Sequence, residues 1–182
     1  MKVIGIISSP NKEGNTSCTV NKILEAAKEK GAETQAWYLD DLAIRPCKSC
    51  YSCKKGTAGC VINDDMQKLY GDIEQSDTII LGSPVYMWQM NAQAKIFTDR
   101  LFSRFSYSKD EHAPRKKMIL VFTQGNPDAG MFKSYYDYTK KMFEFIGYDV
   151  QDMLVVAGTR NEPVRDRKEL IASLKELGAS LV

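Results

Sequence analysis

The sequence predicts an α/β protein, a doubly wound parallel sheet of five strands with helices on both faces. Short apolar runs of strand length alternate with longer segments whose apolar residues recur at helical spacing. Turn-forming residues follow these runs, as they do where a strand leads into a crossover helix. Five strand–helix units in succession favour a parallel sheet covered on both sides.

The expected strands are short and mostly apolar, which suits strands buried on both faces. The third strand is expected to be broken by Gly82-Ser83-Pro84. The five expected ranges are Val3–Ile7, Thr34–Leu39, Thr78–Leu81, Met118–Phe122 and Asp149–Val156.

The expected helices are marked by apolar residues three or four positions apart. Gly31 and Gly147 are expected to end two of them. Asp64, with Gln67 three residues later, predicts a helix start of the capping-box type. The marking positions are Val20, Ile23, Leu24 and Ala27; Met66, Leu69, Tyr70 and Ile73; Met90, Ala94, Phe97 and Leu101; Phe132, Tyr136, Thr139, Phe143 and Ile146; Leu170, Ile171, Leu174 and Leu177.

Length and charge restrict the classes of protein. A chain of 182 residues predicts one domain, 1–182, with a cysteine-rich insertion at about 40–63. The 25 basic and 23 acidic residues give no reason to expect nucleic acid or a membrane as partner. No apolar run approaches the ~20 residues that span a bilayer. The first strand begins almost at Met1, leaving no room for a signal peptide, so we expect a cytoplasmic protein.

The loop after the first strand, Ser8–Ser17, has the composition of a phosphate site. It leads into a helix N-terminus, which offers free N–H groups and a positive dipole end. One Lys and one Glu leave the recognition to neutral donors, which suits a monophosphate, and no Walker or dinucleotide glycine pattern is present. An ordinary turn with an N-cap is the alternative. The donors are Ser9, Asn11, Asn15, Thr16 and Ser17, and Gly14 lets the backbone curl.

Two later loops are expected to meet the first at the crevice where the strand order reverses. They are Gly82–Trp88 and Thr123–Pro127. Their backbone N–H groups suit the polar edge of a flat aromatic ligand, and Pro84, Tyr86 and Trp88 suit its faces. The alternative is that these aromatic residues belong to the core or to an interface.

With these loops in place, the sequence resembles the NAD(P)H-dependent FMN reductase group of flavodoxin-like proteins. The matching pieces are Ser9-Pro10-Asn11, Gly14-Asn15-Thr16, Asp64-Asp65-Met66, Gly82-Ser83-Pro84-Val85-Tyr86, Lys95 with Phe97, Asp99 and Arg100, Ala157-Gly158-Thr159-Arg160 and Leu177-Gly178. The resemblance implies strand order 2-1-3-4-5 and one FMN, with its phosphate on residues 9–17 and its ring between residues 84–88 and 123–125. The FMN-binding residues it implies are Ser9, Pro10, Asn11, Asn15, Thr16, Ser17, Pro84, Val85, Tyr86, Met87, Trp88, Thr123, Gln124 and Gly125.

Four of the five cysteines lie close together in the insertion. An odd total and tight clustering argue against a disulfide framework and for metal or redox chemistry. The run C-x2-C-x2-C followed by x6-C favours an iron–sulfur cluster over zinc, which more often uses two separated pairs. The candidate metal ligands are Cys47, Cys50, Cys53 and Cys60. Cys18 is expected to be a small buried residue.

The same motif in the same place resembles the iron–sulfur flavoproteins of anaerobic microbes. This resemblance implies a [4Fe–4S] cluster that passes electrons to FMN. Zinc, or reduced thiols without metal, are the alternatives. The resemblance also implies a homodimer or homotetramer, and we expect Tyr86, Met87, Trp88 and residues 103–116 to form the contacts.

The function expected is an FMN-dependent oxidoreductase. Electrons would come from NAD(P)H or ferredoxin and pass to a quinone, a nitro or azo compound, or oxygen. No side chain need act as a catalytic acid or base, since the flavin carries the chemistry, and the lone His112 is expected in a solvated loop. The alternatives are a flavodoxin-like electron carrier without substrate turnover and, more remotely, a zinc-stabilised binding module.

Overall fold

The computed structural model describes residues 1–55, 59–105 and 115–182. Within these residues a six-stranded sheet has the order β2-β1-β3-β5-β6, and the short β4 pairs antiparallel with β3. The strand order reverses between β1 and β3, which places the ligand crevice of such a sheet there. The strands are β1 (Lys2–Ile7), β2 (Glu33–Tyr38), β3 (Thr78–Tyr86), β4 (Gln89–Met90), β5 (Lys116–Thr123) and β6 (Tyr148–Val156).

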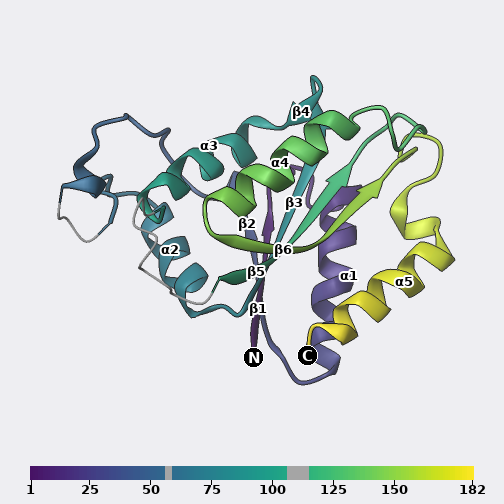
Figure 1. Ribbon diagram of the computed structural model, residues 1–182. Helices are drawn as coiled ribbons and strands as arrows, with labels where there is room; N and C mark the ends of the chain where they lie inside the picture. The colour runs from purple at the N-terminus through teal and green to yellow at the C-terminus, as the bar shows by residue number, and fades with distance from the viewer. Residues whose placement is uncertain (56–58, 106–114) are drawn as a thin grey trace.

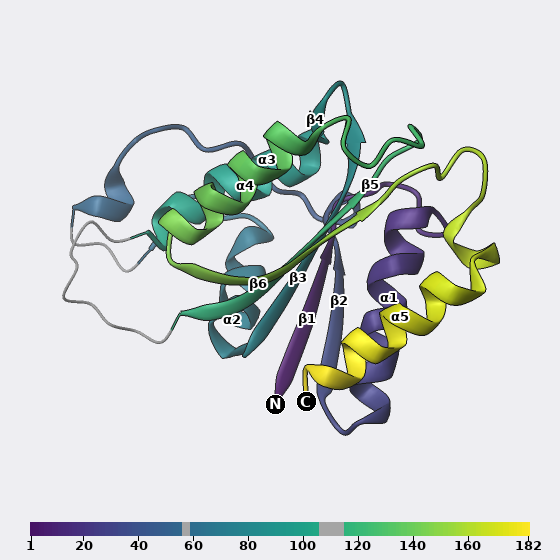
Figure 2. The same cartoon turned by 45° about the vertical axis from the view of Figure 1, so that its right-hand side comes forward.

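Helices cover both faces of the sheet, as expected. Figures 1 and 2 show α1 and α5 on one face and α2, α3 and α4 on the other. The helices are α1 (Asn15–Glu29), α2 (Met66–Gln75), α3 (Ala92–Arg100), α4 (Lys133–Phe145) and α5 (Lys168–Ser180). The segment between β2 and α2 projects from the body beside the start of α2 and the end of α3 (Figure 1).

Two apolar cores lie on opposite faces of the sheet. Alternate residues of β1 divide between them, with Ile4 and Ile6 in one core and Val3 and Ile7 in the other, because successive strand side chains point to opposite faces. The α2–α4 core includes Met66, Leu69, Tyr70, Ile73, Phe97, Leu101, Tyr136 and Phe143. The α1–α5 core includes Val20, Ile23, Leu24, Ala27, Val164 and Leu174.

The contact between α1 and α5 depends on Gly178. A Cβ atom at this position would lie 2.3 Å from the carbonyl oxygen of Ile23 and 2.8 Å from the Cβ of Ala26. Real Cβ atoms do not approach a backbone oxygen so closely, so any side chain at this position would force the helices apart. The glycine therefore sets the spacing of this helix pair.

We expect Gly178→Ala to lower the free energy of unfolding by about 1–3 kcal/mol, the usual cost of overpacking. Gly71→Ala is the matched control, because a Cβ there has no neighbour within 4 Å. That change should raise stability by about 0.5–1 kcal/mol, since alanine favours the helix. Urea unfolding of both variants measures the two effects, and equal stabilities would contradict the packing argument.

Three local expectations were wrong. Gly82-Ser83-Pro84 does not break the third strand, because β3 continues through it to Tyr86. Met90 belongs to β4 rather than to a helix, and the helix begins at Ala92. The capping box does not form either: the N-cap of α2 is Asp65, and the Gln67 side chain donates to the carbonyl oxygens of Cys60 and Ile62.

Candidate FMN site and cysteine segment

The first turn of α1 has the properties of an anion site. The N-cap residue, Gly14, provides no side-chain hydrogen bond, and the turn holds no acidic residue. Its N–H groups therefore remain available to a ligand. The preceding loop is closed on the carbonyl of Asn11, which accepts from the Gly14 N–H at 3.1 Å and from the Ser17 hydroxyl at 2.9 Å. The loop thus holds its curl without using those N–H groups.

Several of the expected donor side chains contact other parts of the protein. The Asn15 Oδ1 accepts from the Val164 N–H at 2.8 Å. The hydroxyls of Thr16 and Thr123 lie 2.6 Å apart and share a hydrogen bond. The Ser9 Oγ accepts from the Asn11 N–H at 3.3 Å. These contacts brace the loop internally and fix the first turn of α1 against β5 and the segment before α5. They leave backbone groups as the main free donors.

The second loop is a β-hairpin that rises from the end of β3. Val85 and Tyr86 pair with Met90 and Gln89, and Met87 and Trp88 form the tip at φ of 46° and 71°. Left-handed backbone is unfavourable for such side chains. The side chains of the tip are exposed, 91% for Met87 and 62% for Trp88. The hairpin therefore holds apolar residues in solvent at the rim of the crevice.

At the base of this hairpin, Gly82 lets α1 approach the sheet. A Cβ at Gly82 would lie 2.6 Å from Val20 Cγ2 and 3.0 Å from Thr16 Cγ2. Because Gly82 has no side chain, the N-terminal part of α1 can pack directly against β3. This close approach places the first and second loops at one edge of the sheet.

The third loop is shaped by the buried side chain of Gln124. Its Nε2 donates to the carbonyl oxygens of Asn126 at 3.0 Å and Asp128 at 2.7 Å. Its Oε1 accepts from the Tyr136 hydroxyl. The backbone of Gln124 is also bonded, since its N–H donates to the Val156 carbonyl and its carbonyl accepts from the N–H and hydroxyl of Thr159. The expected ligand contact in this loop is therefore left to the neighbouring Gly125.

Tyr136, buried below this loop, makes the free energy of unfolding depend on pH in the alkaline range. Burial raises the pKa of Tyr136 to about 12, and burial raises that of Tyr148 to about 12 as well. Both phenols have a pKa near 10 in the unfolded chain, so unfolding releases protons between about pH 10 and pH 12. We expect the free energy of unfolding to fall as the pH rises from about 10 to about 12.

Urea unfolding at a series of alkaline pH values measures this fall. Tyr136→Phe should reduce it by about half, because Tyr148 alone then contributes. An equal fall in the variant and the wild type would contradict the assignment to Tyr136.

Asn91 joins the loops and was not among the expected site residues. Its Nδ2 donates to the Ser8 carbonyl at 2.7 Å, its N–H to the Ser83 hydroxyl at 3.3 Å, and its Oδ1 caps α3 by accepting from Ala94. An Asn before a helix predicts only the cap. The bonds to Ser8, which follows β1, and to Ser83 in β3 come from tertiary contact, which no local pattern indicates.

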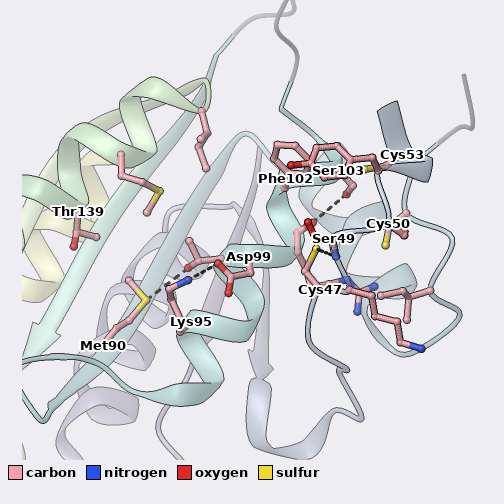
Figure 3. A pocket seen from close by; sticks show the side chains of 18 of the residues that line it. Cys47, Ser49, Cys50, Cys53, Met90, Lys95, Asp99, Phe102, Ser103 and Thr139 are labelled. Atoms are coloured by element: carbon pink, nitrogen blue, oxygen red, sulfur yellow. Dashed lines mark hydrogen bonds and ion pairs between the residues drawn. The ribbon is translucent and has the colours of Figure 1, made fainter. Parts of the chain in front are cut away.

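A cavity of about 760 Å³ lies between the cysteine segment, α3 and α4 (Figure 3). It extends from the cysteines to Gln89 and Met90 at the base of the hairpin. Its lining is largely apolar and aromatic on the α4 side. Its lining includes Cys47, Cys50, Cys53, Cys60 and Arg100.

The four thiols of the segment are free and line this one cavity. Hydrogen bonds from the side chain and backbone of Ser52 lower the pKa of the Cys50 thiol. Ser49 and Tyr51 adopt positive φ, so the backbone turns sharply between the first cysteines. In the ranges 1–55, 59–105 and 115–182, no three His, Cys, Asp or Glu side chains stand close enough together to hold a metal ion. Cys18 is partly buried on α1, and burial raises the pKa of its thiol.

Comparison with known proteins identifies the family. A sequence model described as NADPH-dependent FMN reductase matches residues 1–178. The chain belongs to this family. Its resemblance to the FMN reductase group, first noted from the loop motifs, is confirmed by a match over nearly the whole chain.

Within the FMN reductase family, the chain is similar to proteins named iron–sulfur flavoprotein. One, from Methanocaldococcus jannaschii, is 44% identical over 100 residues, which are 55% of this chain and 51% of that protein. Another, from Methanosarcina thermophila, is 40% identical over 100 residues, 55% of this chain and 52% of that protein. The matched stretch thus spans about half the length of these relatives.

Solved structures confirm the flavodoxin-like fold of this FMN reductase family member. An NAD(P)H:quinone oxidoreductase from Methanothermobacter marburgensis superposes with a TM-score of 0.77 at 14% identity, covering 100% of this chain and 96% of that chain. An FMN-dependent NADH-azoreductase from Bacillus anthracis in complex with FMN gives 0.73 at 17% identity, covering 100% and 99%. Among the described residues, no helix combines the length and apolar character needed to cross a bilayer.

Proposed function

We propose that the chain binds one FMN at the carboxyl edge of the sheet and transfers electrons from NAD(P)H or ferredoxin to a small-molecule acceptor. The observation that carries this proposal is the uncapped first turn of α1, which lies at the strand-order reversal and holds no acidic residue. Membership of the NADPH-dependent FMN reductase family supports it. Quinones, nitro and azo compounds, and oxygen are the acceptor classes we propose.

The residues of the three loops fit such a cofactor. The N–H groups at Asn15, Thr16 and Ser17 would hold the phosphate, because a helix N-terminus favours an anion. The hairpin from Pro84 to Trp88 and the turn 123–125 would hold the ring, with Trp88 braced edge-on against Phe132 at 5.5 Å. When bound, the flavin supplies hydride and single-electron transfer. The protein's part is to orient it and exclude water from one face.

The proposal includes a [4Fe–4S] cluster on Cys47, Cys50, Cys53 and Cys60. The donor set has the right chemistry, because four thiols without disulfide partners line one cavity and thiolates are the ligands of such clusters. In the described residues the thiols are not gathered closely enough to hold a metal ion, so binding would have to draw them together. The names of the relatives from Methanocaldococcus jannaschii and Methanosarcina thermophila support the same choice. Free thiols of this kind suit a reducing compartment, and we place the protein in the cytoplasm.

Anaerobic purification with an absorption spectrum and a metal count tests the two cofactors. Flavin bands with about four iron atoms per chain are expected for a [4Fe–4S] protein. Zinc in place of iron, or metal-free thiols, would overturn the cluster and leave the flavin standing. Absence of flavin after incubation with FMN would overturn the proposed function itself.

Stopped-flow mixing with NADPH or reduced ferredoxin tests the reaction. We expect at least one donor to bleach the flavin absorbance, and the acceptor classes then follow from reoxidation rates. If neither donor bleaches the flavin, the proposal that the chain is an enzyme is overturned. A stable semiquinone without NADPH oxidation would instead identify an electron carrier.

Self-association through the exposed hairpin is part of the proposal. Tyr86, Met87 and Trp88 present apolar side chains to solvent, and such patches mark interaction surfaces. The other expected contact is residues 103–116. Residues 106–114 of this stretch, which include His112, lie outside the described residues. Light scattering should show a homodimer or homotetramer, and a monomer with fully bound FMN would contradict this.

A further inference from the structure

The two ends of the cysteine segment are joined by one side chain, Arg100, at the end of α3. Its Nη1 donates to the carbonyl oxygen of Arg45 at 2.8 Å and to Asp64 Oδ2 at 2.6 Å. Its Nη2 donates to Asp64 Oδ1 at 3.0 Å. Arg45 precedes the first cysteine and Asp64 follows the last, so a single guanidinium spans the base of the segment.

Further bonds tie the same two ends to each other. The Arg45 N–H donates to Asp64 Oδ2 at 2.9 Å, and the Arg45 Nη2 donates to the Asn63 carbonyl at 2.8 Å. Asp64 also accepts from the Met66 N–H at 3.2 Å, which fixes it to the start of α2. The base is therefore a closed network that connects the segment to both α2 and α3.

The ion pair at the centre of this network is buried. The side chain of Arg100 is 0% exposed and that of Asp64 4%. Removing one partner of a buried ion pair strongly destabilises the protein. The intact pair nevertheless adds little stability compared with apolar residues in the same place. Such a pair is suited to fixing a geometry, and the bidentate fork requires arginine, because lysine cannot bond a carboxylate and a carbonyl in the same way.

Arg100 also faces the cavity that the cysteines line. Its Nε–H is buried and has no acceptor within the described part of the chain. The α3 end that holds it is fixed by the Tyr70 hydroxyl, which donates to the Arg100 carbonyl at 2.6 Å. One donor of the guanidinium is thus buried and unpaired among the described residues while the others close the base.

We propose that Arg100 is the positioning residue of the cysteine segment. With Asp64 it closes the base whether or not a metal is bound, so that Cys47 and Cys60, just inside the base, stay close enough to act on one ligand. Its Nε–H, unpaired within the described ranges, would be available to donate to a sulfur of a bound cluster. The closing of the base stands on the geometry alone, and its effect on a cluster rests on the proposed function.

The first experiment needs no metal. Hydrogen exchange over residues 46–63 and the rate of thiol alkylation are measured on the FMN-loaded, iron-free chain. Arg100→Gln should raise both rates about tenfold or more, with FMN affinity unchanged. Arg104→Gln is the matched control, since it breaks the more exposed Arg104–Glu74 ion pair near the same helix end, and it should leave both rates as in the wild type.

The second experiment uses the chain reconstituted anaerobically with iron and sulfide. Arg100→Gln should release iron to a chelator about tenfold faster and lower the midpoint potential of the cluster, because N–H donors to sulfur raise it. The midpoint potential of the flavin should not move. Arg100→Lys should restore the charge but only part of the iron retention, since it lacks the fork.

The outcomes separate the two proposals. If the wild type binds no iron, the cluster fails and the exchange and alkylation rates still decide the role of Arg100. Unchanged rates in Arg100→Gln, or equal iron release from a loaded wild type and variant, would overturn it. If Arg100→Gln does not fold, Asp64→Asn/Arg100→Gln replaces it, because removing both charges leaves no lone buried charge, and wild-type rates in that variant would be decisive against the proposal.

Discussion

Asn11→Asp should lower the affinity for FMN by about tenfold or more while leaving the affinity for riboflavin within about twofold. The substitution keeps the side-chain shape, and its carboxylate can still accept the bond that the Glu13 N–H donates to Asn11 Oδ1 at 3.1 Å. It adds a negative charge to the loop proposed to hold the phosphate. Two unit charges about 4 Å apart repel by about 1–4 kcal/mol, depending on how much water separates them.

Fluorescence titration with the two flavins measures this difference. Riboflavin lacks the phosphate, so it reports on the ring site alone. Asn21→Asp is the matched control, with the same change of charge further along α1 and away from its first turn. Equal losses for FMN and riboflavin, or an equal loss in the control, would show that the phosphate is held elsewhere.

Cys53→Ser should reduce the iron bound at the proposed [4Fe–4S] site from about four atoms per chain to one or fewer, because such a cluster needs four thiolate ligands. The partly buried Cys53 lies in the short helical turn Ser52–Lys54. Serine is smaller and keeps the polarity, so the fold and the FMN content should be unaffected. The loss would therefore report on the cluster ligands and not on the flavin.

Iron and flavin counts on the same anaerobic preparation measure the result. Cys18→Ser serves as the control, since Cys18 lies on α1 and does not line the cavity. Full iron in Cys53→Ser, or the same loss in Cys18→Ser, would contradict the assignment of the ligands.

The alternating layers of the fold could be predicted because each element carries its own pattern. The buried strand β1 is a continuous apolar run, and Gly31 and Gly147 adopt positive φ at helix ends, at 96° and 104°, as expected of glycine. The first loop could be proposed as a phosphate site for the same reason: its donors and turn residues are neighbours in the sequence.

What could not be predicted depends on contacts between distant residues. Asp64 and Gln67 match a capping pattern, but Arg100, far along the chain, bonds the Asp64 carboxylate. The hairpin tip at Met87 and Trp88 adopts positive φ without Gly or Asn, so no turn signal marks it. Pro84 remains inside β3 beside Thr123 at the end of the ladder, although proline normally indicates a break.

The closed base at Arg100 also makes the cysteine segment a module. Once Arg45 and Asp64 are joined, the residues between them form a loop whose closing entropy grows only with the logarithm of its length, about 0.6 kcal/mol for each doubling. The cost of closing this loop therefore changes little with its length. A shorter or longer sequence could therefore be inserted between these two residues at little cost in closing entropy, and the proposed iron–sulfur site could be exchanged for another without rebuilding the sheet.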